Sequence, residues 1–208
     1  MIFFGNSYRR IARGLRSLSV LLGTLGLSAC ASFFPPAGEA LPVQRDDLQD
    51  FALEARFSLR HEEKNFTGRL SWRHAGIRDD LLLASPFGQG MAEIASDAKG
   101  VRLTTGDGKS YEAADAETLT QQALGFPLPL NKLVDWVRGR WFGGESDTVD
   151  VFGRPLRVHQ DGWRIDYEYD SDAPQALPGR LFVAREEGLE LRLRIDEWNV
   201  LRDEGDKP

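Results

Sequence analysis

The 208-residue chain is poor in the residues that build disulfides, metal centres and membrane-spanning helices. It has one cysteine, so no disulfide can form within a single chain. Its three histidines, His61, His74 and His159, form neither an i, i+4 pair nor a cluster with cysteine, which argues against a metal site. No apolar run reaches the roughly 20 residues that a membrane-spanning helix needs. We therefore expect no metal, no cofactor and no transmembrane helix.

The first 29 residues have the three zones of a secretory signal peptide. Four arginines without an acidic residue are followed by a mainly apolar stretch at 18–27 and by small residues before Cys30. The tetrapeptide Leu27-Ser28-Ala29-Cys30 resembles the lipobox of bacterial lipoproteins, which implies cleavage before Cys30 and lipid attachment to it. Ala31 in place of aspartate implies, by similarity to enterobacterial sorting, the outer membrane. The alternative is an ordinary signal peptide with a chance cysteine.

Charge and composition divide the remaining chain into a tether and one domain. Removing residues 1–29 leaves 22 basic and 32 acidic side chains, a net charge of −10, which argues against a nucleic-acid partner. Residues 30–45 are rich in proline and alanine, so we expect a lipidated cysteine followed by a flexible tether. Residues 46–208 form the folded domain, and the acidic segment Asp46 to Asp50 is expected to form a helical turn.

Apolar and polar residues alternate along most of this domain, the pattern of antiparallel strands with one wet face. The alternation is clearest in four stretches: 51–60, 66–73, 163–170 and 189–196. Glycines at 76, 100, 108, 162 and 188 mark turns between strands. We expect about ten strands in sequential hairpins, and a sheet of that size tends to curl or close.

Two short helices are expected in the middle of the chain. Ala116 to Leu124 follows Asp115, a good N-cap, and stops at Gly125. A second apolar stripe at i, i+3, i+4 and i+7 comprises Leu130, Leu133, Val134 and Val137. Two such helices are too short to form a second layer, so we expect them to cover one side of a curled sheet.

The sequence contains carboxylates and potential nucleophiles, but their spacing does not match that of a catalytic site. The carboxylates fall on the polar faces of predicted strands, and no nucleophile is flanked by a base. The stretch Thr105 to Lys109 has the glycines of a hairpin turn but not the spacing of a phosphate-binding loop. We therefore expect a protein that is not an enzyme.

An ordered set of motifs covers nearly the whole mature chain. The motifs are Gly68-Arg69-Leu70 with Trp72, Ser85-Pro86-Phe87-Gly88, Gly125 to Leu130 with Leu133, Trp136 and Gly139, Gln160 with Gly162-Trp163, Tyr167, Tyr169, Leu177-Pro178, and Leu191 to Trp198. Together they resemble the LolB family of outer-membrane lipoprotein receptors. Two features depart from the family pattern: Ala55-Arg56 stands where Gly-Arg is common, and the segment before Phe51 matches poorly.

The resemblance implies a mainly β fold, a curved and incompletely closed antiparallel β-barrel, or half-barrel, that encloses an apolar cavity beneath short helices. It further implies a monomer at the periplasmic face of the outer membrane. Such a protein accepts the acyl chains of lipoproteins from the periplasmic carrier LolA and inserts them into the inner leaflet of the outer membrane. Two alternatives stay open: a structural or assembly-accessory lipoprotein without lipid cargo, and a lipid-processing enzyme.

Two sets of site residues follow. Pro86, Phe87 and Gly88 occupy positions of a type I turn that places Phe87 on the tip, where the resemblance implies membrane insertion. Alternatively, Phe87 packs against the core. The candidate lining of the cavity is Leu70, Trp72, Leu83, Met91, Leu133, Val134, Trp136, Val137, Trp163, Tyr167 and Trp198. These residues could equally belong to a filled core, because a cavity wall and a core have the same sequence pattern.

Overall fold

The structure, a computed structural model, describes residues 45, 48–142, 145–185 and 188–201. The predicted signal peptide at 1–29 and all of the tether except Arg45 lie outside these residues, as do Asp46 and Asp47. Leu48 to Asp50 do not form the helical turn expected there: Gln49 and Asp50 make a bend that leads into the first strand. No helix within the described ranges is long and apolar enough to cross a membrane.

Eleven strands among the described residues form one antiparallel sheet, one more than the approximate number expected. They are β1 Phe51–His61, β2 Lys64–Ala75, β3 Arg78–Ala84, β4 Gly90–Asp97, β5 Gly100–Thr105, β6 Ser110–Ala113, β7 Glu145–Val149, β8 Pro155–Gln160, β9 Trp163–Glu168, β10 Arg180–Arg185 and β11 Leu189–Val200. The sheet order is β6-β5-β4-β3-β2-β1-β11-β10-β9-β8-β7. The first and last strands therefore pair at its centre, while β6 and β7 are left as its two edges.

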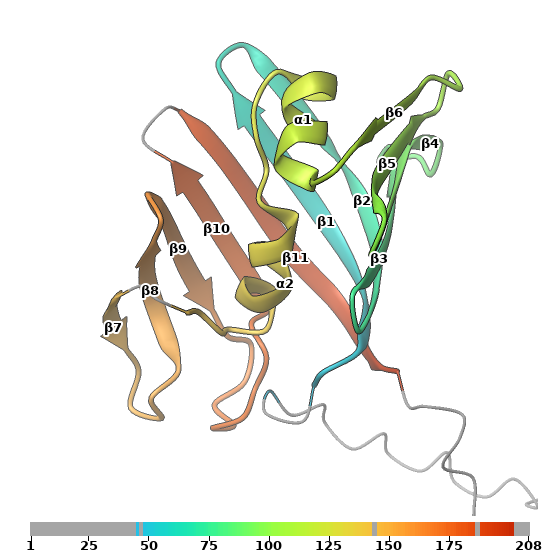
Figure 1. Ribbon diagram of the computed structural model, residues 1–208. Helices are drawn as coiled ribbons and strands as arrows, with labels where there is room; N and C mark the ends of the chain where they lie inside the picture. The colour runs from blue at the N-terminus through green and yellow to red at the C-terminus, as the bar shows by residue number, and fades with distance from the viewer. Residues whose placement is uncertain (1–44, 46–47, 143–144, 186–187, 202–208) are drawn as a thin grey trace, which may run out of the picture. The chain divides into compact units, whose positions relative to one another are not determined.

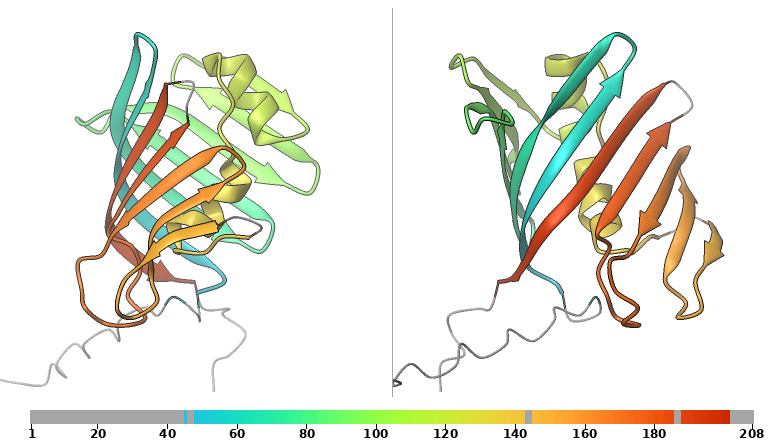
Figure 2. Two further views of the ribbon diagram at one scale, coloured as in Figure 1. Left: turned by 90° about the vertical axis from the view of Figure 1, so that its left-hand side faces the viewer. Right: turned by 180° about the vertical axis from the view of Figure 1, so that it is seen from behind.

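The sheet is strongly curved but not closed, as the half-barrel prediction required. Figure 1 shows the β3–β6 wing and the β7–β10 wing on either side of the long central strands, and Figure 2 shows the same bend from two other directions. Along β1 the buried residues alternate with exposed ones, from Phe51 to Leu59, so one face of the sheet holds the apolar side chains.

Antiparallel order places successive turns at opposite ends of the strands. The upper rim, as drawn in Figure 1, holds the turns β1–β2, β3–β4, β5–β6 and β8–β9. The lower rim holds the turns β2–β3, β4–β5 and β7–β8, the β9–β10 loop, and the chain where it enters β1. These two rims are the reference for the sites described below.

Both predicted helices are present and connect the two edge strands. Helix α1, Ala116–Leu124, begins at Asp115, whose carboxylate accepts a 2.7 Å hydrogen bond from the Thr118 amide, and ends at Gly125 with a φ of 91°. Helix α2, Leu130–Val137, follows after a short extended link. Figure 1 shows them between the two wings, on the concave side of the sheet.

Gly68 in β2 marks a place where two strands approach closely. A Cβ atom there would lie 2.1 Å from the Ala84 carbonyl oxygen and 3.0 Å from the Phe57 ring. Contacts this short are not tolerated, so only glycine fits without a shift of the backbone. The glycine thereby permits the close approach of β2 and β3.

Candidate functional site

An apolar cavity of about 240 Å³ lies between the β3–β6 wing, the central strands and the two helices. Its lining comprises Phe57, Leu59, Phe66, Leu70, Trp72, Leu81, Leu83, Met91, Ala92, Ile94, Leu103, Thr105, Tyr111, Thr120, Ala123, Leu124, Leu128, Leu130, Leu133, Leu191 and Leu193. None of these described lining residues is acidic or basic. The cavity is therefore suited to a hydrocarbon chain and would penalise a charged guest.

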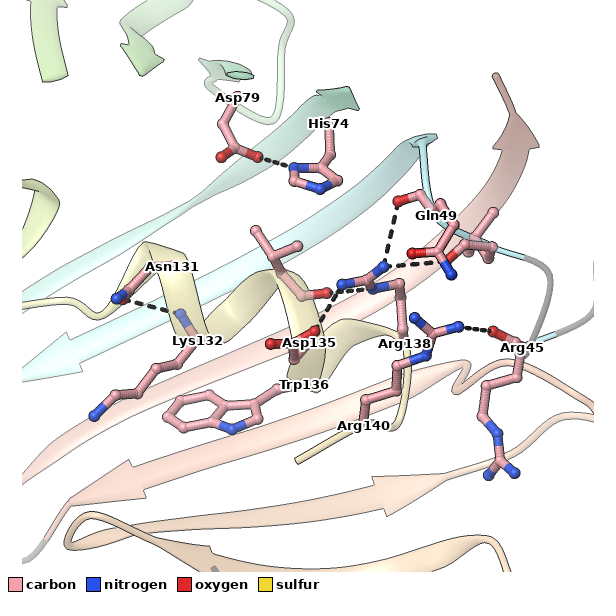
Figure 3. Close-up of polar contacts among 12 residues, drawn as sticks. Arg45, Gln49, His74, Asp79, Asn131, Lys132, Asp135, Trp136, Arg138 and Arg140 are labelled. Carbon is pink, nitrogen blue, oxygen red and sulfur yellow. Dashed lines mark hydrogen bonds and ion pairs between the residues drawn. The ribbon is translucent and has the colours of Figure 1, made fainter. Parts of the chain in front are cut away.

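Two polar side chains at the cavity wall, Thr120 and Trp72, form hydrogen bonds within the protein. Thr120 in α1 donates to the Ala116 carbonyl at 2.8 Å and accepts from the Leu128 amide at 2.8 Å. The indole nitrogen of Trp72 donates to Asp79 at 2.9 Å, and the same carboxylate lies 2.8 Å from His74 Nδ1 (Figure 3). These bonds keep the polar atoms satisfied while the apolar parts of the side chains face the cavity.

Five of the eleven candidate lining residues line this cavity: Leu70, Trp72, Leu83, Met91 and Leu133. The other six, Val134, Trp136, Val137, Trp163, Tyr167 and Trp198, do not. Most of them are buried where α2 packs on the sheet, and there the rings of Trp136 and Trp163 are 6.0 Å apart and Trp136 donates to Gln160 at 2.9 Å. Burial raises the pKa of Tyr167 there. Trp198 instead stacks edge-on against Phe51 at the lower end of the sheet.

Helix α1 contributes lining residues that the sequence interpretation missed. Thr120, Ala123 and Leu124 lie at i, i+3 and i+4 and face the cavity together. This spacing is visible in the sequence and would have predicted their common face. Alanine and threonine are only weakly apolar, however, so the pattern is less clear there than in α2. The missed strand residues, such as Phe57 and Leu103, follow the same inward alternation as the residues that were identified.

Polar contacts hold α2 firmly to the sheet and to the lower rim (Figure 3). Arg138, which is 6 % exposed, donates to the Val134 carbonyl at 2.9 Å, to the Leu48 carbonyl at 3.1 Å and to Asp135 at 2.7 Å. Burial lowers the pKa of Arg138, and Asp135 opposes that shift. At the other end of the helix, Lys132 pairs with Asp161 at 2.7 Å.

Helix α1 is held to the strands by fewer polar contacts. Among the residues that the structure describes, one side chain of the sheet bonds to this helix: the exposed Lys64 ammonium donates to the Leu124 carbonyl at 2.7 Å. The ring of His61 also stacks on Phe126, just beyond the helix, with centroids 4.8 Å apart. The cover of the cavity thus combines a buried, cross-linked α2 with an α1 held by a surface bond and apolar packing.

The β3–β4 turn on the upper rim presents an exposed phenylalanine. The Gly88 amide donates to the Ser85 carbonyl at 2.8 Å, and the Ser85 amide donates to the Gln89 carbonyl at 2.7 Å. Phe87 occupies the tip and is 94 % exposed, which disagrees with the alternative that its ring packs against the core. Gly88 has a φ of 86°, a conformation that glycine adopts without strain.

The cavity wall continues to the base of this turn. Leu83 precedes Phe87 by four residues and Met91 follows it by four, and both line the cavity. The exposed tip and the apolar interior therefore share the same two strands, β3 and β4.

The chain is similar in sequence to a protein family and to several of its members. The profile of the family described as "Outer membrane lipoprotein LolB" matches residues 49–198. "Outer-membrane lipoprotein LolB" of Dechloromonas aromatica is 42 % identical over 86 % of this chain and 95 % of its own length. The protein of the same description from Thiobacillus denitrificans is 38 % identical over 88 % of this chain and 98 % of its own.

Among solved structures, the chain is similar to a LolA superfamily protein from Nitrosomonas europaea, with a TM-score of 0.47 and 14 % identity over 77 % of this chain and 89 % of that one. The family assignment rests on the sequence matches alone. By the matched profile and these relatives, the chain belongs to the outer-membrane lipoprotein LolB family.

Proposed function

We propose that this protein accepts acylated lipoproteins from the periplasmic carrier LolA and inserts them into the inner leaflet of the outer membrane. A lipid on Cys30 holds it at the periplasmic face of that membrane. The observation that carries the proposal is the apolar cavity, whose lining has no charged side chain, beside the exposed Phe87 tip on the same two strands. Membership of the family supports it.

Energetics require a protected path for such a cargo. A triacylated lipoprotein released into water exposes roughly 45 methylenes at about 0.8 kcal/mol each, which amounts to tens of kcal/mol. No state of that free energy is populated on a useful timescale. The acyl chains must therefore pass directly from the cavity of the carrier to the cavity of the acceptor.

The cavity must widen to hold this cargo. Its volume of about 240 Å³ lies below the range of roughly 300–1,000 Å³ that is usual for small-molecule pockets. One of the two helices that cover the cavity therefore has to move away from the sheet. Helix α1 forms fewer hydrogen bonds with the rest of the domain than α2 does. We infer that acyl chains enter by displacing α1 while α2 stays in place.

No nucleotide-binding motif is present in the sequence, so transfer runs down a gradient of affinity. Purified protein, mixed with carrier loaded with radiolabelled lipoprotein and no nucleotide, should acquire the label, and added liposomes should then receive it. Cargo without acyl chains is the control and should not transfer. Failure of acylated cargo to move, or a need for ATP, would contradict the proposal.

Native mass spectrometry distinguishes this function from that of a structural lipoprotein without cargo. Protein purified without its own lipid anchor should carry copurifying acyl groups if the cavity is a binding site. An acyl-free protein that also fails in the transfer assay would favour the structural alternative.

A further inference from the structure

A second exposed apolar tip lies on the lower rim, far along the sheet from Phe87. Four of the nine large apolar side chains that are exposed among the described residues fall within residues 149–156. They are Val149, Val151, Phe152 and Leu156, and Val151 at the tip of the β7–β8 turn is 92 % exposed. Single exposed apolar residues are ordinary, but four in one hairpin indicate a contact surface.

The turn that presents them is firmly built. The Asp150 carboxylate accepts hydrogen bonds from the Phe152 amide at 2.9 Å, from the Arg154 amide at 2.9 Å and from Arg154 Nε at 2.6 Å. The Gly153 amide donates to the Asp150 carbonyl at 3.0 Å. The two charged side chains of the turn neutralise each other, so the tip itself is apolar and uncharged.

Arg154 also ties this turn to the β9–β10 loop. The residue is 4 % exposed, and its guanidinium donates to the carbonyls of Ser171 at 2.7 Å and Ala173 at 2.9 Å. It lies over the Tyr169 ring, 4.2 Å from the centroid. Turn and loop therefore form one unit at the lower rim, where Figures 1 and 2 show them side by side.

The chain that carries the lipid anchor enters the domain at this same unit. The Arg45 amide donates to the Gln175 carbonyl of the β9–β10 loop at 3.1 Å, and Arg140 donates to the Arg45 carbonyl at 2.8 Å (Figure 3). Arg45 lies fifteen positions after Cys30, a reach of at most about 50 Å. Because the tether enters the domain at the lower rim, an anchored Cys30 leaves this rim within reach of the bilayer.

We propose that the Val151–Phe152 tip docks the lower rim on the bilayer that holds the lipid anchor. The occupant of this surface is thus the lipid–water interface, to which the tether delivers it and into which an uncharged apolar tip fits. This inference rests on the proposed anchoring at Cys30. Because the two apolar tips lie on opposite rims, they serve different steps: Val151 holds the domain at rest, and Phe87 acts during release.

A fluorescence experiment on the lipidated full-length protein tests this docking. Cys30 is the single cysteine and its thiol is consumed by the lipid, so Val151→Cys provides a unique site for an environment-sensitive label. In liposomes we expect emission from this label to shift to the blue and to be quenched by phospholipids that carry a nitroxide near the headgroup. Glu63→Cys, in an exposed turn on the upper rim, is the matched control and should show neither effect.

Flotation of the same liposomes separates the possible failures. Protein that does not float lacks the anchor, which contradicts the proposed anchoring. Protein that floats but keeps the Val151 label in water contradicts the docking proposal alone. If the emission of the label at position 151 shifts only when the carrier is added, the tip contacts a protein partner. That result also overturns membrane docking.

The corresponding charge variant gives a second readout. Val151→Asp should reduce bilayer binding of protein that lacks the anchor by about tenfold or more, since it replaces an apolar tip with a charge. Its melting temperature and its uptake of cargo from the carrier should match those of the wild type, because Val151 lies outside the core and the cavity. Unchanged bilayer binding would overturn the proposal.

Discussion

Replacing Phe87 by glutamate should separate the release of cargo from its uptake. The ring is 94 % exposed in the free protein, so it loses almost no packing on substitution. If it enters the lipid phase during release, its burial contributes about 1.5–3 kcal/mol to that encounter, a factor of roughly 10 to 150 in population. A glutamate at the tip forfeits this contribution and adds the cost of dehydrating a charge. Delivery to liposomes should therefore slow by at least about tenfold.

Uptake and stability should be preserved in this variant. The backbone hydrogen bonds that close the turn, from Gly88 to Ser85 and from Ser85 to Gln89, do not involve the Phe87 side chain. Substitutions at such exposed positions usually change the free energy of unfolding by no more than about 0.5 kcal/mol. The cavity lining begins four residues away, at Leu83 and Met91, so the binding surface is untouched.

The assay compares two rates on one preparation: transfer of labelled cargo from the carrier and its delivery to liposomes. Phe87→Leu is the matched control, since it keeps an apolar tip, and should deliver cargo nearly as well as the wild type. Equal loss of both rates in Phe87→Glu, together with a lower melting temperature, would refute the insertion mechanism and assign Phe87 a structural role.

Three further variants, two of them with a matched control, test the cavity, the close approach of β2 and β3, and the anchor. Ala123→Trp places an indole in the cavity and should sharply reduce cargo uptake, whereas Gln122→Trp on the exposed side of α1 should retain it, as the transfer assay would measure. Gly68→Ala should lower the free energy of unfolding by about 1–3 kcal/mol because its Cβ meets the backbone of the neighbouring strand. Gly90→Ala, with open space around it, should change that free energy by less than about 0.5 kcal/mol in the same denaturation experiment. Cys30→Ala should leave a soluble or uncleaved protein that is not firmly held in outer-membrane fractions, as fractionation with a salt wash would measure.

Local patterns predicted the elements well because each depends on neighbouring residues. The alternation from Phe51 to Leu59 became β1, and Asp115 and Gly125 cap α1 as expected. The pairing of β1 with β11 at the centre of the sheet is a contact between residues up to about 150 positions apart, and no local pattern encodes it. The half-barrel itself was predicted from the family resemblance rather than from periodicity.

The site was predicted less completely, for a physical reason. Trp72 and Trp163 both face inward from an alternating strand, yet Trp72 borders the cavity and Trp163 packs against Trp136 of α2. Which inward position meets empty space depends on the curvature of the sheet and on where the helices rest. The β3–β4 turn was easier to predict, because Ser85, Pro86 and Gly88 fix its geometry locally and leave Phe87 at the tip.

The two helices differ in how they are held to the rest of the domain. At the end of α2, Trp136 and Val137 are fully buried, and Arg138 bonds to the chain at the entrance of β1. The cavity lies beneath α1 and the start of α2, so the contacts that a packed core would supply are missing there. The strands β3 and β4, which are joined by the turn that carries Phe87, border this cavity. If the proposed function holds, the path of the acyl chains therefore follows the β3–β6 wing between the cavity and the exposed Phe87 tip.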